Sequence, residues 1–333
     1  MAQSKKTKVI AGIGTIVVLA IGLITGVDND KKSIPFYYSY MPISAFENND
    51  YRCSNKQGAA LAWLGNHTQE HLDNLCIKQW YTYSPQNYTN RYTDIHYTPF
   101  FWCHKVQEGS SQGRLYRDWF AEQYPDTSYS GTLLFYNEWN HINQCVATSN
   151  QMLSDFAWVK SHYPNAKLIV GNTHGYDGGF FFPKLTEIHD LIVGAGYNWC
   201  DDIYATSYHD YYWTGDPALF YGRLSTLLDS WGCTEQPIIV SEWGADNSTN
   251  IVNHLEFYTN TPRVEQHYYF APCQDEWAGT PLNLYDVEII PSEPYNKLVC
   301  EQTFTIRGQA FHDYIFDTQS ISKQQIAYPY REE

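Results

Sequence analysis

The sequence lacks the short motifs that mark many nucleotide-dependent and metal-dependent enzymes. Its 333 residues contain no GxGxxG or GxxxxGK[ST] loop, no HExxH and no CxxC. A doubly wound nucleotide-binding sheet usually carries a glycine-rich phosphate loop after an early strand. Zinc ribbons and thioredoxin-like redox sites use CxxC pairs. We therefore expect neither a cofactor nor a bound metal.

Basic residues are also scarce. Lys and Arg number 21 against 36 Asp and Glu, which gives a net charge of −15, and the basic residues form no long cluster. Binding to a phosphate backbone needs clustered Lys and Arg, so nucleic acid is excluded as a partner. The chain still has 43% hydrophobic residues and only 17% charged ones, which is enough apolar material for a substantial core.

Aromatic residues are abundant. They make up 17% of the chain and include 29 Tyr and 11 Trp. Tyr and Trp fill cores, but they also suit flat apolar ligands such as the faces of sugar rings. A carbohydrate ligand is therefore worth testing against the rest of the sequence.

The first residues predict a membrane-targeting segment. Lys5, Lys6 and Lys8 precede an uncharged apolar run, Val9 to Val27, which is long enough to cross a bilayer. Basic residues before such a run keep the N-terminus cytoplasmic and export the remainder. A cleaved signal peptide is the alternative, although Ile24-Thr25-Gly26 is a weak cleavage site. We expect an extracellular or cell-surface protein, either secreted or held by an anchor over residues 9–27.

Eight cysteines fit that location. An even number in an exported chain allows up to four disulfides, and the sequence leaves their connectivity open. We divide the chain into a signal anchor or signal peptide (1–32), a connector (33–55), a catalytic domain (56–316) and a C-terminal tail (317–333), and we expect a monomer.

From Gln57 onward, apolar strand-like segments alternate with segments of helical spacing. The expected strands lie in 58–64, 75–84, 95–103, 131–138, 166–172, 201–209, 237–244 and 264–271. The expected helices are 115–122, 155–162, 184–193, 217–231 and 250–258. Alternation of this kind implies parallel strands joined by right-handed crossovers, and eight strands close an α/β barrel of the (β/α)8 (TIM) type. An open doubly wound sheet is the alternative.

In a (β/α)8 barrel, reactive side chains gather at the carboxyl ends of the strands. Only two strand candidates end in an acidic residue followed by tryptophan: the fourth ends in Asn137-Glu138 and the seventh in Ser241-Glu242. Each glutamate alone is more often a solvated loop residue, but the pair favours catalysis. Two facing carboxylates cleave a glycosidic bond with retention when one acts as nucleophile and the other as proton donor. Asn137 is placed to bind the sugar hydroxyl beside the reacting carbon.

The order of these motifs resembles the retaining (β/α)8 glycoside hydrolases of clan A. Within that clan, the chain is most similar to the endo-β-1,3-glucanases of glycoside hydrolase family 128. The segments that carry the resemblance are Lys56–Trp63, Gln79–Tyr83, Pro99–Trp102, Leu134–Glu138, Pro237–Glu242 and Thr305–Phe311. Their order and spacing are specific, whereas no single segment is.

The resemblance implies a β-glucan substrate, with Glu138 as acid/base and Glu242 as nucleophile. It also implies that Trp80 and Trp102 line the sugar cleft. Further candidates near expected strand ends are Tyr208, His209, Trp243 and Trp277.

Three positions depart from the family's pattern. Trp139 stands where the family usually has proline, Ser207 where it has histidine, and His209 where it has the tyrosine that supports the nucleophile. His209 either takes over that support or the support is lost. Two alternatives to an enzyme therefore remain: a glycan-binding barrel with impaired catalysis, and a membrane-tethered adhesion protein that uses its aromatic surface.

Overall fold

The computed structural model describes residues 54–61, 67–106, 112–139, 144–174, 181–211, 216–272, 283–290 and 297–316. The expected anchor over residues 9–27 and the tail 317–333 lie outside the described residues, as does the connector 33–55 except for its last two positions. Within the described part of the chain, no helix has both the length and the apolar character needed to cross a membrane.

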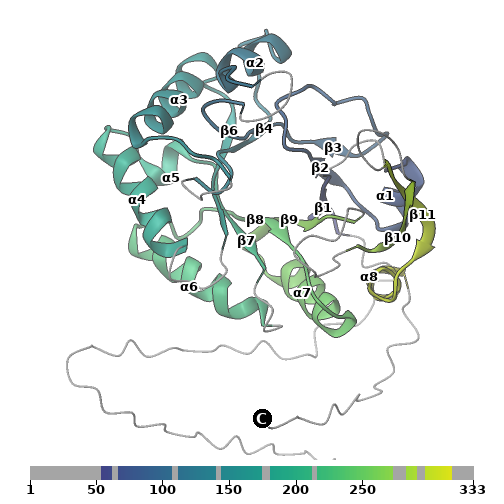
Figure 1. Cartoon of the computed structure of the whole chain (residues 1–333). Helices are drawn as coiled ribbons and strands as arrows, with labels where there is room; N and C mark the ends of the chain where they lie inside the picture. The colour runs from purple at the N-terminus through teal and green to yellow at the C-terminus, as the bar shows by residue number, and fades with distance from the viewer. Residues whose placement is uncertain are drawn as a thin grey trace, which may run out of the picture. The chain divides into compact units, whose positions relative to one another are not determined.

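Nine strands form a single parallel sheet that curls into a ring (Figure 1). The strands are β1 (Gln57–Ala60), β2 (Gln79–Tyr81), β3 (His96–Tyr97), β4 (Phe100–Phe101), β5 (Thr132–Phe135), β6 (Lys167–His174), β7 (Ala205–Asp210), β8 (Ile238–Trp243) and β9 (Val264–Phe270). The hydrogen-bonded order is β3-β2-β1-β9-β8-β7-β6-β5-β4.

The two edge strands of this sheet are halves of one chain segment, and this closes the ring. β3 pairs with β2, and two residues later β4 pairs with β5. The backbone between them continues both ladders, since the Thr98 amide donates to the Trp80 carbonyl at 2.9 Å and the Leu134 amide donates to the Pro99 carbonyl at 3.1 Å. β3 and β4 therefore count as one strand of the barrel, and the nine strands make eight barrel strands, each called a stave below. The expected (β/α)8 barrel is confirmed.

Helices cover the outside of the barrel (Figure 1). They are α1 (Gln69–Asn74), α2 (Tyr116–Gln123), α3 (Ser149–His162), α4 (Phe181–Gly194), α5 (Trp199–Asp202), α6 (Pro217–Ser230), α7 (Ser248–Asn260) and α8 (Ile306–Phe316). The five expected helices correspond to α2, α3, α4, α6 and α7. Threonine, asparagine or aspartate side chains cap the N-termini of α1, α3, α5, α6 and α7, which satisfies backbone amides that have no partner within the helix.

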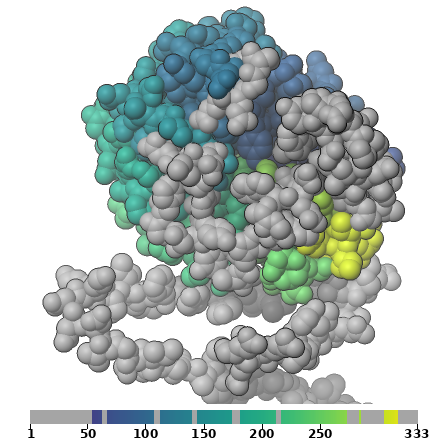
Figure 2. All heavy atoms as spheres, in the orientation of Figure 1, coloured from purple at the N-terminus to yellow at the C-terminus, as the bar shows by residue number. Residues whose placement is uncertain are grey.

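An antiparallel pair, β10 (Tyr285–Ile290) and β11 (Lys297–Phe304), precedes α8. The sequence pattern did not predict this pair. α8 packs beside α7 (Figures 1 and 2), and its Gly308 lies so close to the Leu284 carbonyl that an added Cβ would be 1.7 Å from the oxygen. The close approach explains why the helix needs glycine at this position.

The barrel interior is filled by one side chain from each stave. This inner cluster consists of Ala60, Tyr81, Phe100, Leu134, Ile169, Ala205, Ile239 and Tyr268. A second, larger cluster lies between the strands and the helices. Successive side chains in a strand point to opposite faces, so strand neighbours such as Trp80, Phe101 and Leu133 belong to the outer cluster. The same alternation decides which residues at the strand ends face the barrel mouth.

Disulfide bonds link chain segments at both ends of the barrel. Cys103 pairs with Cys145, Cys200 pairs with Cys233, and Cys76 is also disulfide-bonded. The described cysteine side chains include no free thiol. The first pair lies just after β4 and β5, on the mouth side, and the second lies just before β7 and β8, at the opposite end.

Candidate active site

Glu242 is the next-to-last residue of β8, and its side chain lies inside the barrel mouth, 4% exposed. Two tyrosine hydroxyls donate to its carboxylate, Tyr83 to Oε1 at 2.7 Å and Tyr211 to Oε2 at 2.6 Å. The Tyr81 hydroxyl lies 3.2 Å from Oε1 and donates its one proton to the nearer Ser241 carbonyl at 2.7 Å. Hydrogen bonds to an ionised acceptor are the stronger kind, so the two donors fix the carboxylate and favour its charged form.

Opposing forces act on the pKa of Glu242. Burial raises it above its ordinary value, while the nearby His209 lowers it, the negative charge of Glu138 raises it, and the hydrogen bonds from Tyr211 and Tyr83 lower it. The net direction is upward, because desolvation outweighs the donors. Glu242 therefore ionises at a higher pH than a solvated glutamate.

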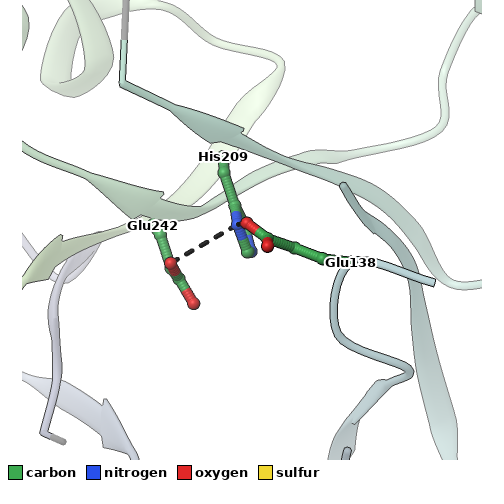
Figure 3. A group of neighbouring side chains, drawn as sticks. All are labelled: Glu138, His209 and Glu242. Carbon is green, nitrogen blue, oxygen red and sulfur yellow. Dashed lines mark hydrogen bonds and ion pairs between the residues drawn. The ribbon is translucent and has the colours of Figure 1, made fainter. Parts of the chain in front are cut away.

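His209 lies between the two glutamates (Figure 3). Its Nδ1 is 2.9 Å from Glu138 Oε1 and 3.4 Å from Glu242 Oε2, and the side chain is fully buried. Burial lowers the pKa of the imidazole, partly offset by Glu242, so the ring is neutral near pH 7. One oxygen of each carboxylate and one ring nitrogen lie within 4.8 Å of one another.

Glu138 reaches the mouth on a sharp turn after β5. Its φ is 43° and that of Tyr136 is 60°, a left-handed conformation that non-glycine residues seldom adopt. Backbone bonds to neighbouring staves hold the turn: the Tyr136 amide donates to the Phe101 carbonyl at 2.8 Å, and the Glu138 amide donates to the Asn172 carbonyl at 2.7 Å. Such strain persists only where the surroundings determine the conformation.

Side chains pin the same turn from outside the barrel. The Tyr136 hydroxyl donates to Asp155 Oδ2 at 2.8 Å, and His104 Nδ1 lies 2.8 Å from the same oxygen. The indole of Trp139 is buried, and its Nε1 donates to the Ala147 carbonyl at 2.8 Å. Trp139, one of the three departures, therefore anchors the segment that carries Glu138.

Ser207, the second departure, supports Glu138 indirectly. Its hydroxyl donates to the side-chain oxygen of Asn172, Oδ1, at 2.7 Å and accepts from the backbone N–H of Asn172 at 2.9 Å. Gly171, with φ 127°, is pressed against Ser207, because an added Cβ would lie 2.3 Å from the Ser207 carbonyl oxygen. This bulge between β6 and β7 positions the Asn172 carbonyl that receives the Glu138 amide.

Three side chains that the sequence predicted to contact sugar do not face the barrel mouth. Trp80, Tyr208 and Trp243 are fully buried in the outer cluster, between strands and helices. Each is the immediate neighbour of a residue that does face inward, namely Tyr81, His209 and Glu242, and strand alternation turns it away from the mouth. They pack the barrel wall instead.

The other predicted residues lie at or near the mouth. Trp102 follows β4, is half-buried and contacts both clusters. Asn137 is buried beside Glu138, and its Nδ2 donates to Gln144 Oε1 at 3.0 Å. No partner for Asn137 Oδ1 occurs among the residues that the structure describes. Trp277 lies outside the described residues.

Sequence reasoning missed Tyr81, Tyr83 and Tyr211. With 29 tyrosines in the chain, no single one stands out. The available signal was spacing: Tyr81 and Tyr83 are two apart at the end of a stave, and Tyr211 is two residues after His209, so each pair shares a face. Tyr211 provides the nucleophile contact that the departure at His209 put in doubt.

A cavity of about 710 Å³ lies at the other end of the barrel, where the strands begin. Its wall includes Lys78, Gln79, His96, Thr132 and Gln266. None of the predicted site residues lines it. The acidic cluster at the mouth, rather than this cavity, is the place where the chain's reactive groups converge.

Comparison with solved structures finds the same fold in β-1,3-glucanases of glycoside hydrolase family 128. The chain superimposes on the subgroup I endo-β-1,3-glucanase from Amycolatopsis mediterranei in complex with laminaritriose, with a TM-score of 0.55, 15% identity, and coverage of 78% of this chain and 99% of that one. The subgroup II endo-β-1,3-glucanase from Sorangium cellulosum gives a TM-score of 0.54 at 16% identity over 78% of this chain and 98% of that one.

A third match is the subgroup III curdlan-specific exo-β-1,3-glucanase from Blastomyces gilchristii in complex with glucose, with a TM-score of 0.50, 15% identity, and coverage of 79% and 99% of the two chains. No protein-family model matches the sequence. A search of curated proteins finds no match either. The resemblance seen in the sequence is thus confirmed at the level of the fold.

Proposed function

We propose that this chain is a retaining glycoside hydrolase that cleaves β-1,3-glucan internally. The observation that carries the proposal is the pair of buried carboxylates at the barrel mouth, with an oxygen of Glu138 within 4.8 Å of an oxygen of Glu242. Retaining glycosidases hold their carboxyl groups roughly 5–5.5 Å apart, whereas inverting ones leave roughly 6.5–9.5 Å for a water. The short separation favours direct attack by one carboxylate.

The surroundings of the two residues suggest their roles. Glu242 accepts hydrogen bonds from the hydroxyls of Tyr83 and Tyr211, an environment suited to a carboxylate that must be ionised to attack. Repulsion between the two carboxylates acts on both, so the role of Glu138 rests on its place after β5, where the resembling hydrolases carry the proton donor. Glu242 is therefore the nucleophile and Glu138 the acid/base.

The reaction proceeds in two displacements. A Glu242 oxygen attacks the anomeric carbon while Glu138 gives its proton to the departing glycosidic oxygen, which leaves a glycosyl ester on Glu242. Glu138, now ionised, takes a proton from water, and the resulting hydroxide attacks the anomeric carbon and frees Glu242. His209 Nδ1, 2.9 Å from Glu138 Oε1 and 3.4 Å from Glu242 Oε2, keeps the two carboxylates in place.

The substrate assignment rests on the neighbours and on the aromatic mouth. Two similar structures are endo-β-1,3-glucanases and one contains laminaritriose. Trp102 offers a half-buried indole near the mouth on which a glucose ring can stack. Asn137 Oδ1, which has no partner among the described residues, is available for a sugar hydroxyl beside Glu138.

We also propose that the protein acts outside the cytoplasm. Support comes from the disulfides Cys103–Cys145 and Cys200–Cys233, because such bonds persist mainly in oxidising compartments. The basic and apolar N-terminal sequence is consistent with export. Whether residues 9–27 act as an anchor is tested by fractionating cells before and after a carbonate wash.

The test of function is hydrolysis by the full chain of laminarin, mixed-linkage glucan and mannan. We expect oligosaccharide release from laminarin, with products of intermediate length early in the reaction. Binding of laminarin without release of sugar would support a glycan-binding barrel instead. Release of glucose alone from chain ends would replace the endo assignment by an exo one.

A further inference from the structure

The substitution that brings His209 to the mouth creates a set of metal-ligand atoms. Two carboxylate oxygens and one imidazole nitrogen, from three different staves or their following turns, lie within 4.8 Å of one another. All three side chains are buried. Figure 3 shows the His209 ring between the ends of the two glutamate side chains. His nitrogen with carboxylate oxygen is a donor set that suits zinc-class cations.

The spacing of the atoms also fits a bound cation. Zinc–nitrogen and zinc–oxygen bonds are about 2.0–2.2 Å, so two ligands are about 3.0 Å apart at a right angle and about 3.4 Å apart at the tetrahedral angle. His209 Nδ1 lies 2.9 Å from Glu138 Oε1 and 3.4 Å from Glu242 Oε2. Each carboxylate oxygen therefore lies at a distance from Nδ1 that a shared cation allows, and the two oxygens lie within 4.8 Å of each other.

The surroundings make the cluster rigid and leave a place for the displaced proton. Tyr83 and Tyr211 hold the Glu242 carboxylate, and backbone bonds hold the Glu138 turn. His209 Nε2 is buried and has no partner among the described residues, so it can carry the ring proton once a metal occupies Nδ1.

We propose that Glu138, His209 and Glu242 form a binding site for a zinc-class divalent cation, which occupies the mouth when substrate is absent and competes with it. Mg²⁺ and Ca²⁺ should bind weakly at this site. They prefer oxygen ligands in six-fold or higher coordination, and a histidine nitrogen is a poor ligand for them. The binding itself is independent of the proposed hydrolase activity, whereas the competition with substrate rests on it.

The experiment is isothermal titration of the full chain with ZnCl₂, with MgCl₂ as the comparison cation. One tight zinc site is expected in the wild type and none for magnesium. His209→Asn, Glu138→Gln and Glu242→Gln should each weaken zinc binding at least about 100-fold, because each removes a direct ligand and loss of even an outer-shell partner costs about 10–100-fold. Near-UV circular dichroism identifies any variant that fails to fold, and a single folded variant suffices.

The matched control is His189→Asn. His189 Nδ1 lies 2.9 Å from the exposed Asp190, and its half-buried ring stacks on Trp231, so this change removes a histidine–carboxylate pair on helix α4 that contains none of the three proposed ligands. The tight zinc site should survive it unchanged. Equal zinc affinity in the wild type and in a folded His209→Asn variant would overturn the proposal and assign the binding to other residues.

A parallel assay separates the two proposals. If zinc raises the KM for laminarin with kcat unchanged, both proposals stand. If the wild type hydrolyses no glucan but loses its zinc site on His209→Asn substitution, the hydrolase proposal fails and the metal site remains. If laminarin is hydrolysed and zinc at saturation leaves KM unchanged, competition is refuted.

Discussion

The two glutamates of the mouth are held in opposite ways. Glu242 is the next-to-last residue of β8, at a break in the strand register, and Tyr83 and Tyr211 donate to its carboxylate while Tyr81 lies 3.2 Å away. Glu138 lies on a left-handed turn, and its position is fixed through the backbone. Both carboxylates contact His209, but only Glu242 receives hydrogen bonds from tyrosine hydroxyls, and only Glu138 is carried by a left-handed turn of the main chain.

This difference matches the two tasks. A nucleophile needs its charge and orientation controlled where the new bond forms, and preorganised donors do this at no cost during the reaction. A proton donor must also accept the proton back, so donors that fix it in the ionised form would hinder it. The turn positions Glu138 while leaving its carboxyl group to His209 and the substrate.

The largest expected effect comes from removing each carboxylate. Glu242→Ala and Glu138→Ala should each lower kcat/KM for laminarin by roughly 10⁴-fold, the scale seen when a direct catalytic group is deleted. The two should differ on an aryl β-glucoside with a good leaving group, which departs without a proton. Glu138→Ala should still release the aryl alcohol there in a rapid burst, and Glu242→Ala should not.

The burst is measured by stopped-flow absorbance. Azide is a useful addition, because it fits the space left by either side chain and attacks as an anion. It should speed turnover of the Glu138→Ala glycosyl-enzyme. A burst in Glu242→Ala and none in Glu138→Ala would reverse the assigned roles.

The next effect concerns the disulfide that closes the Glu138 turn. The Cys103–Cys145 bond spans 42 residues, and its removal by the double change to serine should lower the free energy of unfolding by about 2–4 kcal/mol. It should also lower kcat, because the disulfide holds in place the Cys145 backbone, whose N–H donates to the Asn137 carbonyl at 3.3 Å beside Glu138.

The control is the Cys200–Cys233 pair, which spans 33 residues at the other end of the barrel. Its replacement by serine should cost similar stability and leave kcat near the wild-type value. Chemical denaturation and laminarin kinetics measure both quantities. Equal kcat losses in the two double variants would mean that the Glu138 turn does not depend on its local disulfide.

The donors to Glu242 should control the acid limb of the pH–rate profile. Because the pKa of Glu242 is raised, ionisation of the nucleophile and hence activity should appear only above the usual glutamate range of about 4.3. Tyr211→Phe removes a hydrogen bond that lowers this pKa, so the limb should move to still higher pH. The loss in kcat/KM should be roughly 10–100-fold, the range for a hydrogen bond to a charged group.

Tyr163→Phe is the matched control. Its hydroxyl donates to the Tyr124 carbonyl at 2.7 Å in the outer layer and touches neither glutamate. The acid limb should stay in place in this variant even if the protein loses some stability. If the acid limb of the pH–rate profile stays at the same pH in Tyr211→Phe, the Tyr211 hydroxyl does not control the pKa of Glu242.

The smallest effect is expected at Trp139. Trp139→Phe keeps an aromatic ring in the buried site but removes the hydrogen bond from Nε1 to the Ala147 carbonyl. Thermal unfolding should show a loss of about 1 kcal/mol, the ordinary value of one such bond. A severalfold fall in kcat larger than that of an equally destabilised variant elsewhere would show that the indole also sets the Glu138 position.

Most of the fold was predictable because the alternation of strands and helices is regular. All eight expected staves contain a strand, and Asp216 before Pro217 marked the start of α6 as expected. The β10–β11 pair was missed, although Tyr285, Val287 and Ile289 alternate with Asp286 and Glu288 as expected of a strand. The split of one stave into β3 and β4 follows from the ring closure, a tertiary effect.

The site was predictable in its charges but not in its packing. Two glutamates after apolar runs marked the mouth. Trp80 and Trp243 were misassigned because proximity to a strand end does not say which face a side chain takes. The tyrosines on Glu242 escaped because their role depends on the register between neighbouring staves, for example the shift between β7 and β8 at His209.

The central claim is that Glu242 forms a covalent intermediate. The direct test is proton NMR of the first anomer released from a reduced laminari-oligosaccharide, followed before mutarotation. The account predicts a β-configured reducing end, which is retention. An α-configured first product would mean inversion by water and would contradict the assignment of Glu242 as the nucleophile.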